Sequence, residues 1–65
     1  MYKWEVHTHA DEEGYAPIIG FVETSQPDYG DATELAKYYA QAGEFDTKHS
    51  EYDASDVSYV TPSRY

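Results

Sequence analysis

Residues 2–9 alternate between apolar and polar side chains. The more apolar face carries Tyr2, Trp4, Val6 and Thr8, and the polar face carries Lys3, Glu5, His7 and His9. A period of two is typical of a half-buried β-strand with one face in water. Residues Ile18 to Thr24, behind Pro17, predict a second strand, and the polar stretch ending in Gly14 predicts a hairpin connection. Gly20 within that strand indicates a bulge or a close backbone contact.

The clearest local signal predicts a helix from about Ala32 to Ala42. Asp31, with Glu34 three residues later, forms a variant of the capping box that opens many helices. Apolar residues then recur at helical spacing, at Ala32, Leu35, Ala36, Tyr39 and Ala40. Gly43 predicts the helix end, because glycine adopts the left-handed conformation at little cost.

The remaining chain predicts one or two more strands. Phe45, Thr47 and His49 alternate with polar residues between Glu44 and Ser50, which favours a third strand, and residues 52–55 suggest a turn. A fourth short strand is predicted over Asp56–Thr61, with Val57 and Tyr59 on one face and Val60 on the other. The order strand-strand-helix-strand predicts a single α+β domain over residues 1–65. We expect a three- or four-stranded antiparallel sheet with one helix packed across it.

The net charge of the chain limits the classes of partner that it is expected to bind. Thirteen acidic residues against four basic ones give a formal charge of −9. Direct binding to nucleic acid or to an anionic membrane requires a basic surface, so neither is expected. An acidic protein instead meets basic protein surfaces quickly, such as the DNA-binding channels of nucleic-acid enzymes. The charge also fits two plainer interpretations, which are solubility and adaptation to a salty cytoplasm.

Aromatic residues make up 17% of the chain, which predicts a folded protein, and its eight tyrosines exceed what so small a core can bury. Exposed tyrosines are favoured in protein interfaces. Tyr39 fits the apolar stripe of the helix, so Tyr38 is expected to face outward. The predicted partner-binding residues are Asp11, Glu12, Glu13 and Tyr15 in the hairpin, and Tyr29, Glu34 and Tyr38 near the helix.

No catalytic pattern emerges from the sequence. The chain has no cysteine, no phosphate-binding glycine loop and no nucleophile elbow. The histidines of His7-Thr8-His9, with His49, suggest a metal site, but histidines on the wet face of a strand are more often simply solvated. The carboxylates of Asp11, Glu12 and Glu13 are expected in a solvated hairpin, an environment that is poorly suited to general acid–base catalysis. We therefore expect no enzyme activity, cofactor or metal.

The chain also lacks the long apolar run of a signal peptide or a membrane span. It is therefore expected to act in the cytoplasm of a host cell, as a monomer or weak dimer. An exposed edge strand near Val57 to Val60 is one place where it would pair with itself or with a partner's sheet.

Several short motifs are shared with one family. They are Tyr2-Lys3-Trp4, Tyr15-Ala16-Pro17-Ile18, Glu23-Thr24, Glu34-Leu35-Ala36-Lys37-Tyr38 and Ala42-Gly43. In these motifs the chain resembles the small transcription inhibitors of short-tailed coliphages, which bind the jaw of the host RNA polymerase at the downstream DNA channel. The family has two arginines on its third strand that matter for binding. Here Lys48 stands near the first and Ser50 near the second, and the loop Gln26–Gly30 is longer.

The resemblance implies a phage-encoded inhibitor that covers a basic surface of RNA polymerase, and it adds Lys48 to the partner-binding residues. Two alternatives stay open. One is a DNA-mimic inhibitor of a CRISPR or restriction effector, with Glu5, Glu12 and Glu23 spaced like phosphates. The other is a salt-adapted acidic domain without an inhibitory role.

Overall fold

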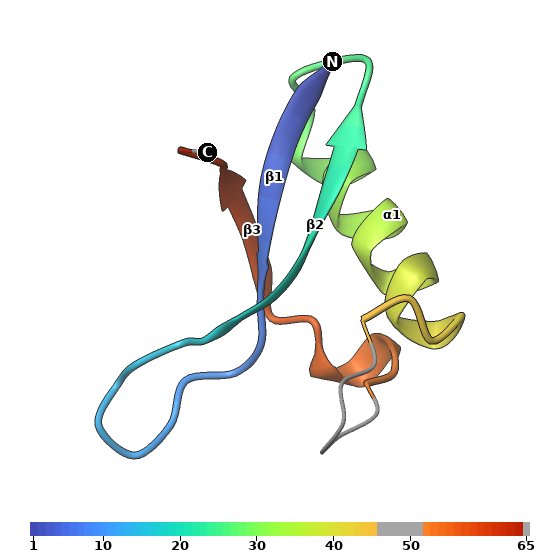
Figure 1. Ribbon diagram of the computed structural model, residues 1–65. Coiled ribbons are helices and arrows are strands. Elements are labelled where there is room, and N and C mark those ends of the chain that lie inside the picture. Colours follow the sequence, from blue (N-terminus) through green and yellow to red (C-terminus); the bar gives the residue numbers. More distant parts are fainter. Residues whose placement is uncertain (46–51, 65) are drawn as a thin grey trace.

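A three-stranded antiparallel sheet with one helix across it forms the fold (Figure 1). The computed structural model describes residues 1–45 and 52–64. Its elements are β1 (Tyr2–His7), β2 (Ile18–Thr24), α1 (Tyr29–Gln41), the 3-10 helix η1 (Ala54–Asp56) and β3 (Tyr59–Pro62). β1 is the central strand, antiparallel to β2 and to β3. The predicted α+β fold class is confirmed.

The strands differ in how well the alternating pattern located them. β2 has the predicted bounds, whereas β1 ends at His7 and not at His9. The strand predicted over Asp56–Thr61 is β3, which begins three residues later because η1 occupies its start. The other predicted strand, from Glu44 to Ser50, lies outside the described residues after Phe45, and Glu44 and Phe45 themselves are in a turn.

The core lies between the sheet and α1. Trp4 and Val6 of β1, Val22 of β2 and Val60 of β3 face the buried stripe of Ala32, Ala36 and Ala40. The small side chains of these alanines let the helix backbone lie close to the sheet. Val57 is buried with Val60, contrary to the prediction that placed them on opposite faces, because Val57 precedes β3 and enters the core from the end of η1.

The helix begins three residues earlier than predicted, because Asp28 and not Asp31 is its N-cap. The Asp28 carboxylate accepts hydrogen bonds from the backbone N–H groups of Gly30 (2.8 Å) and Asp31 (3.1 Å). Asp31 instead lies in the first turn, where a negative charge is favourable beside the helix N-terminus. The predicted end is confirmed, since Gly43 follows the C-cap residue Ala42 with a φ of 81°.

Gly20 sits at a bulge and beneath an aromatic ring, so both of the predicted reasons for this glycine hold. Val6 pairs with Gly20 and His7 with Ile18, which leaves Ile19 as the extra residue. A Cβ at position 20 would clash with the ring of Phe45, a residue beyond the helix end.

Gly20→Ala is therefore expected to destabilise the protein by about 1–3 kcal/mol in chemical denaturation. Without the ring, a tolerated glycine-to-alanine change would stabilise by about 0.4–1 kcal/mol. A loss of stability in Gly20→Ala would therefore indicate that the Phe45 ring contacts this position, whereas a gain would indicate that it does not. Adding Phe45→Leu should make the double variant more stable than the sum of the two single effects predicts. A Gly20→Ala protein as stable as the parent would show that Phe45 does not press on this position.

The turn predicted at residues 52–55 is the start of η1, and Asp53 caps it. The Asp53 carboxylate accepts hydrogen bonds from the Ser55 hydroxyl and from the Ser55 backbone N–H (2.8 Å). In return, the Asp53 N–H donates to the Asp56 carboxylate at 2.9 Å. The two bonds from Ser55, the one from its side chain first, together with the backbone N–H of Asp56, hold the pKa of Asp53 below its ordinary value of 3.8.

Asp53→Asn is expected to lower the melting temperature slightly at neutral pH. Because the folded-state pKa of Asp53 is lowered, its stabilising effect is complete above the unfolded-state value of 3.8 and is lost as the pH falls through the lower folded-state value. The difference in melting temperature between parent and variant, measured by circular dichroism, should therefore become smaller in acid. A difference that stays constant from neutral pH to about pH 2 would contradict this role.

Candidate protein-binding site

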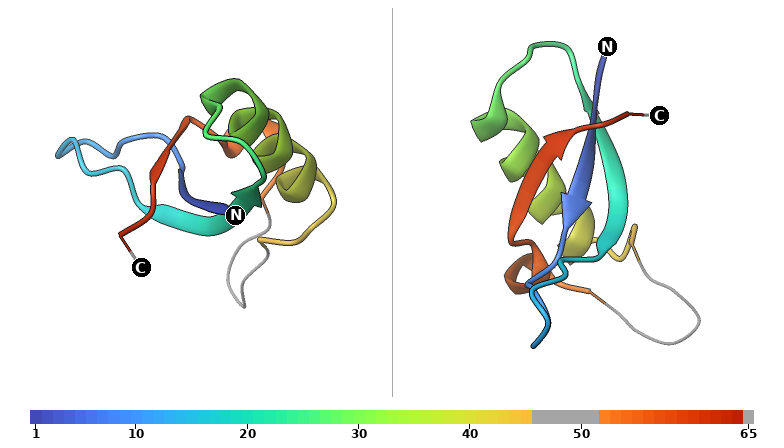
Figure 2. Two further views of the ribbon diagram at one scale, coloured as in Figure 1. Left: turned by 90° about the horizontal axis from the view of Figure 1, so that it is seen from above. Right: turned by 90° about the vertical axis from the view of Figure 1, so that its left-hand side faces the viewer.

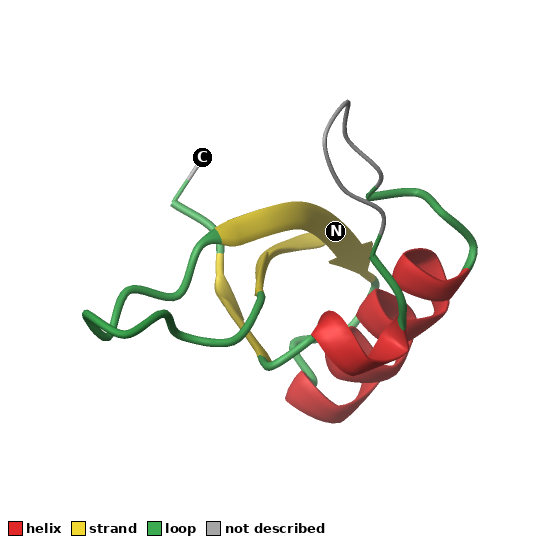
Figure 3. Cartoon of the chain, turned by 90° about the horizontal axis from the view of Figure 1, so that it is seen from below, coloured by secondary structure: helices red, strands yellow, loops and turns green. Residues whose placement is uncertain are grey.

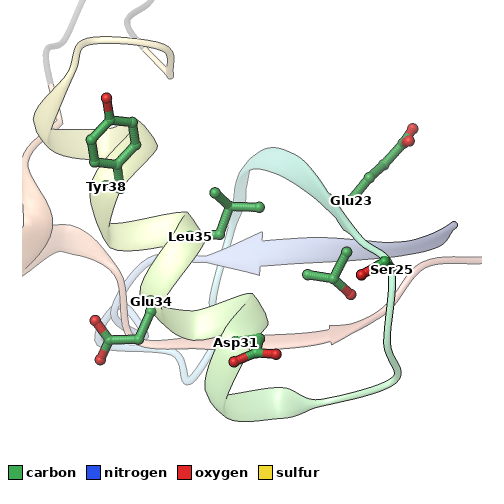
Figure 4. A pocket seen from close by; sticks show the side chains of 7 residues that line it. Glu23, Ser25, Asp31, Glu34, Leu35 and Tyr38 are labelled. Carbon is green, nitrogen blue, oxygen red and sulfur yellow. The ribbon is translucent and has the colours of Figure 1, made fainter.

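A groove with acidic sides runs between the end of β2 and the outer side of α1 (Figure 4). It is shallow and open to solvent, with a volume of about 450 Å³, and we call it the acidic groove. Its lining residues are Glu23, Thr24, Ser25, Asp31, Glu34, Leu35 and Tyr38.

The hydrogen bonds of Thr24 and the Asp28 helix cap hold the two sides of the acidic groove in place. Thr24, the last residue of β2, accepts a hydrogen bond from the Trp4 indole N–H (2.8 Å) and donates one to the Gln26 carbonyl (2.6 Å). The strand end is thereby tied to the core. On the other side, the Asp28 cap sets where α1 begins, so Asp31, Glu34 and Tyr38 recur at helical spacing along one face.

The acidic groove combines an apolar floor with exposed charge. Leu35 is half-buried against the core, whereas Glu23, Asp31 and Glu34 are exposed and Tyr38 is 67% exposed. Figure 4 shows Leu35 turned toward β2, with Glu23 and Glu34 pointing away from each other on opposite sides. An exposed tyrosine beside an apolar floor is the kind of feature on which protein interfaces are built.

The directions of the carboxylates decide what they can bind. A metal ion needs several oxygen ligands that converge on one point. Within residues 1–45 and 52–64, no three His, Cys, Asp or Glu side chains form such a group. Carboxylates that diverge around a groove instead suit separate cationic side chains on an extended surface. The Glu23 and Glu34 carboxylates of the acidic groove therefore do not converge on one point.

The structure divides the predicted partner-binding residues between two places. Glu34 and Tyr38 lie together in the acidic groove. The hairpin with Asp11, Glu12, Glu13 and Tyr15 joins the opposite end of the sheet and extends away from α1 (Figures 1 and 2). Tyr29 lies at the start of α1 and packs its ring on Trp4, with 4.8 Å between ring centroids, while remaining 57% exposed. Lys48 lies outside the described residues.

Within the hairpin, Asp11 has a structural role. Its carboxylate accepts hydrogen bonds from the backbone N–H groups of Glu13 (2.9 Å) and Tyr15 (3.0 Å), and its backbone carbonyl accepts one from Gly14 (3.0 Å). Gly14 has a φ of 86°, which glycine adopts readily. Glu12, Glu13 and Tyr15 are exposed around this turn.

The histidines and Glu5 have specific neighbours that the alternating pattern did not reveal. His7 contacts the Ala16 carbonyl through Nδ1 (2.9 Å) and the Thr61 hydroxyl through Nε2 (3.1 Å). His9 contacts the Ser55 carbonyl at 2.7 Å, and His49 lies outside the described residues. Glu5, expected on the wet face of β1, is only 8% exposed. Of the three carboxylates in the predicted DNA-mimic array, Glu12 and Glu23 are therefore exposed and Glu5 is mostly covered.

Of the seven residues that line the acidic groove, the sequence predicts two, Glu34 and Tyr38, as partner-binding residues. The sequence pattern places Asp31 at the helix cap and Leu35 in the apolar stripe, and it does not indicate a contact role for Ser25. The spacing of Asp31, Glu34, Leu35 and Tyr38 did contain a signal, because these positions share one side of a helix. Their meeting with Glu23 depends on how α1 crosses the sheet, and no local pattern encodes that crossing.

Comparisons of the chain with protein-family models, curated proteins and solved structures each found no match. In the described part of the chain, no helix is both long enough and apolar enough to span a bilayer. The role of the acidic groove is therefore inferred from its geometry and charge.

Proposed function

We propose that this protein is a phage-encoded inhibitor that covers a basic, nucleic-acid-binding surface of a host enzyme, with bacterial RNA polymerase as the first candidate. The observation that carries the proposal is the exposed Tyr38 in a groove flanked by Glu23, Asp31 and Glu34. The site of action is then the host cytoplasm. The motifs shared with the coliphage transcription inhibitors support the choice of enzyme.

The two kinds of residue in the acidic groove contribute differently. A tyrosine at the centre of an interface supplies large, stiff contact area, so the affinity is expected to depend on Tyr38 and on the Leu35 floor. Carboxylates at a wet rim mainly raise the association rate toward a basic surface, and salt weakens this effect. With a net charge of −9, the protein should associate with its partner faster as the salt concentration falls.

Affinity capture from bacterial lysate tests the proposal. The tagged protein is used as bait at low and at moderate salt, and bound proteins are identified by mass spectrometry. RNA polymerase subunits should be enriched over a bait carrying Tyr38→Ala. Enrichment of a nuclease or CRISPR complex would favour the DNA-mimic alternative. No enrichment at either salt would contradict the proposal and favour an acidic domain without an inhibitory role.

A further inference from the structure

Glu5 occupies an unusual position on the face of the sheet that α1 does not cover. Figures 2 and 3 show α1 to one side of the sheet only. Glu5 lies on the other side of the central strand, between Phe21 of β2 and Thr61 of β3 in the register. It is nevertheless only 8% exposed. A carboxylate buried this far normally has strong donors or an opposite charge beside it.

The groups that reach the Glu5 carboxylate do so at long distances. The Thr61 hydroxyl lies 3.5 Å from Oε1, and the backbone N–H of Arg64 lies 3.4 Å from Oε2. Charge-assisted hydrogen bonds to a carboxylate are usually about 2.7–2.9 Å long. Both oxygens of Glu5 therefore have room for a stronger donor.

His7 lies beside Glu5 without a hydrogen bond to its carboxylate. Its Nδ1 contacts the Ala16 carbonyl, which can only accept, so Nδ1 carries a proton. His7 Nε2 lies 3.1 Å from the Thr61 hydroxyl, the same group that reaches Glu5 Oε1. His7 Nε2 and Glu5 Oε1 are 3.9 Å apart, and this is the one ion-pair contact of Glu5 within residues 1–45 and 52–64. The Arg64 guanidinium forms none there.

A hollow of about 560 Å³ lies over this carboxylate. Besides Glu5, His7, Thr61 and Arg64, its walls are Ile18, Tyr59 and Pro62. The Tyr59 ring is stacked on the His7 ring, with 4.5 Å between centroids and 8° between planes, and Tyr59 is 43% exposed. A carboxylate beside an aromatic wall matches a planar guanidinium, which pairs with carboxylates through two hydrogen bonds and stacks on aromatic rings.

We propose that the hollow over Glu5 accepts an arginine side chain of the bound protein. The inference rests on the proposed function for the source of that arginine, since a surface that binds nucleic acid is rich in this residue. The arginine guanidinium would replace the two long contacts of Glu5 with short, charge-assisted ones and lie near Tyr59, on the part of the ring that His7 leaves uncovered. This contact is separate from the acidic groove, because it lies on the opposite face of the sheet from α1.

Titration of the isotope-labelled protein with N-acetyl-arginine amide, followed by NMR, tests the site without any partner protein. We expect saturable shifts of the His7, Tyr59 and Thr61 amide signals, with a dissociation constant that is about millimolar. The matched probe N-acetyl-citrulline amide has the same shape without the charge and should produce no saturable shift. Equal shifts with both probes, or no shift with the arginine probe, would overturn the inference.

Two variants locate the contact. Glu5→Gln keeps the shape of the side chain and should weaken binding of the arginine probe about tenfold or more, with a dispersed amide spectrum as the control for folding. Tyr59→Leu leaves the carboxylate in place and should weaken binding about threefold, through loss of the aromatic wall. Unchanged affinity in either folded variant would contradict the assigned site.

The two proposals fail separately. If RNA polymerase is captured but the arginine probe does not bind, the hollow is not the arginine site and the proposed function stands. If the arginine probe binds at Glu5 but no nucleic-acid enzyme is captured, the proposed function is wrong and the guanidinium site stands.

Discussion

Replacement of Trp4 by alanine is expected to remove a large part of the protein's free energy of unfolding and to lower its melting temperature strongly. Trp4 is 3% exposed, packs against Tyr29 and joins β1 to the end of β2 through its hydrogen bond to Thr24. Truncating a buried tryptophan to alanine costs about 3–5 kcal/mol. A domain of 65 residues has a total free energy of unfolding of about 3–10 kcal/mol, so the loss is a large part of it. Chemical and thermal unfolding followed by far-UV circular dichroism would measure this loss.

Trp4→Phe separates packing from hydrogen bonding in this prediction. It keeps an aromatic ring in the core and removes the indole N–H, so its destabilisation should be much smaller than that of Trp4→Ala. Tyr38→Ala is the control for aromatic loss at the surface and should leave the melting temperature almost unchanged. A Trp4→Ala protein that melts near the temperature of the parent would contradict the described core.

Changes in the acidic groove are expected to have the largest effect on partner binding. Tyr38→Ala should weaken binding about tenfold or more, as expected for a central aromatic anchor. Glu34→Lys should lower the association rate several-fold and reduce its dependence on salt, because it alters the charge at the rim. Both residues are exposed, so neither change should alter the fold. Real-time measurement of binding to the surface-immobilised partner would give the association rate and the dissociation rate separately.

The hairpin provides matched controls for these variants. Tyr15 is 65% exposed and Tyr38 is 67% exposed, so Tyr15→Ala removes a comparable ring from the other end of the sheet. Glu12→Lys makes the same change in net charge as Glu34→Lys. If the acidic groove is the interface, both hairpin variants should bind nearly as the parent does. Stronger effects from the hairpin pair would place the interface around Tyr15 instead.

A salt-adapted domain makes a different prediction about stability. Proteins that depend on a salty cytoplasm fold poorly at low salt, because their surface carboxylates repel one another. The inhibitor proposal requires the protein to be folded in ordinary buffer. Melting curves at low and at molar salt distinguish the two, and unfolding at low salt would favour the salt-adapted interpretation.

The sequence predicted those parts of the structure whose signals are local. The alternation through Trp4 and Val6, the β-branched segment from Ile18 to Thr24 and the stop at Gly43 each correspond to an element of the fold. The cap was misplaced because Asp28 and Asp31 are both good capping residues three positions apart. Only the path of the preceding loop decides between them.

Features that depend on the packing of distant segments could not be predicted. Glu5 is buried because Thr61 and the Arg64 backbone close over it, more than 55 residues along the chain. The acidic groove likewise forms where Glu23 meets the outer side of α1. The sequence therefore identified Glu34 and Tyr38 as surface residues without showing which carboxylates they join.

Binding of the purified protein to purified bacterial RNA polymerase, at about 0.05 M and about 0.3 M salt, tests the central claim most directly. The proposal predicts saturable binding that is faster at the lower salt, and at least tenfold weaker binding by Tyr38→Ala than by Tyr15→Ala. No binding of the parent protein, or equal binding by the two tyrosine variants, would contradict the claim that the acidic groove covers a basic surface of this enzyme.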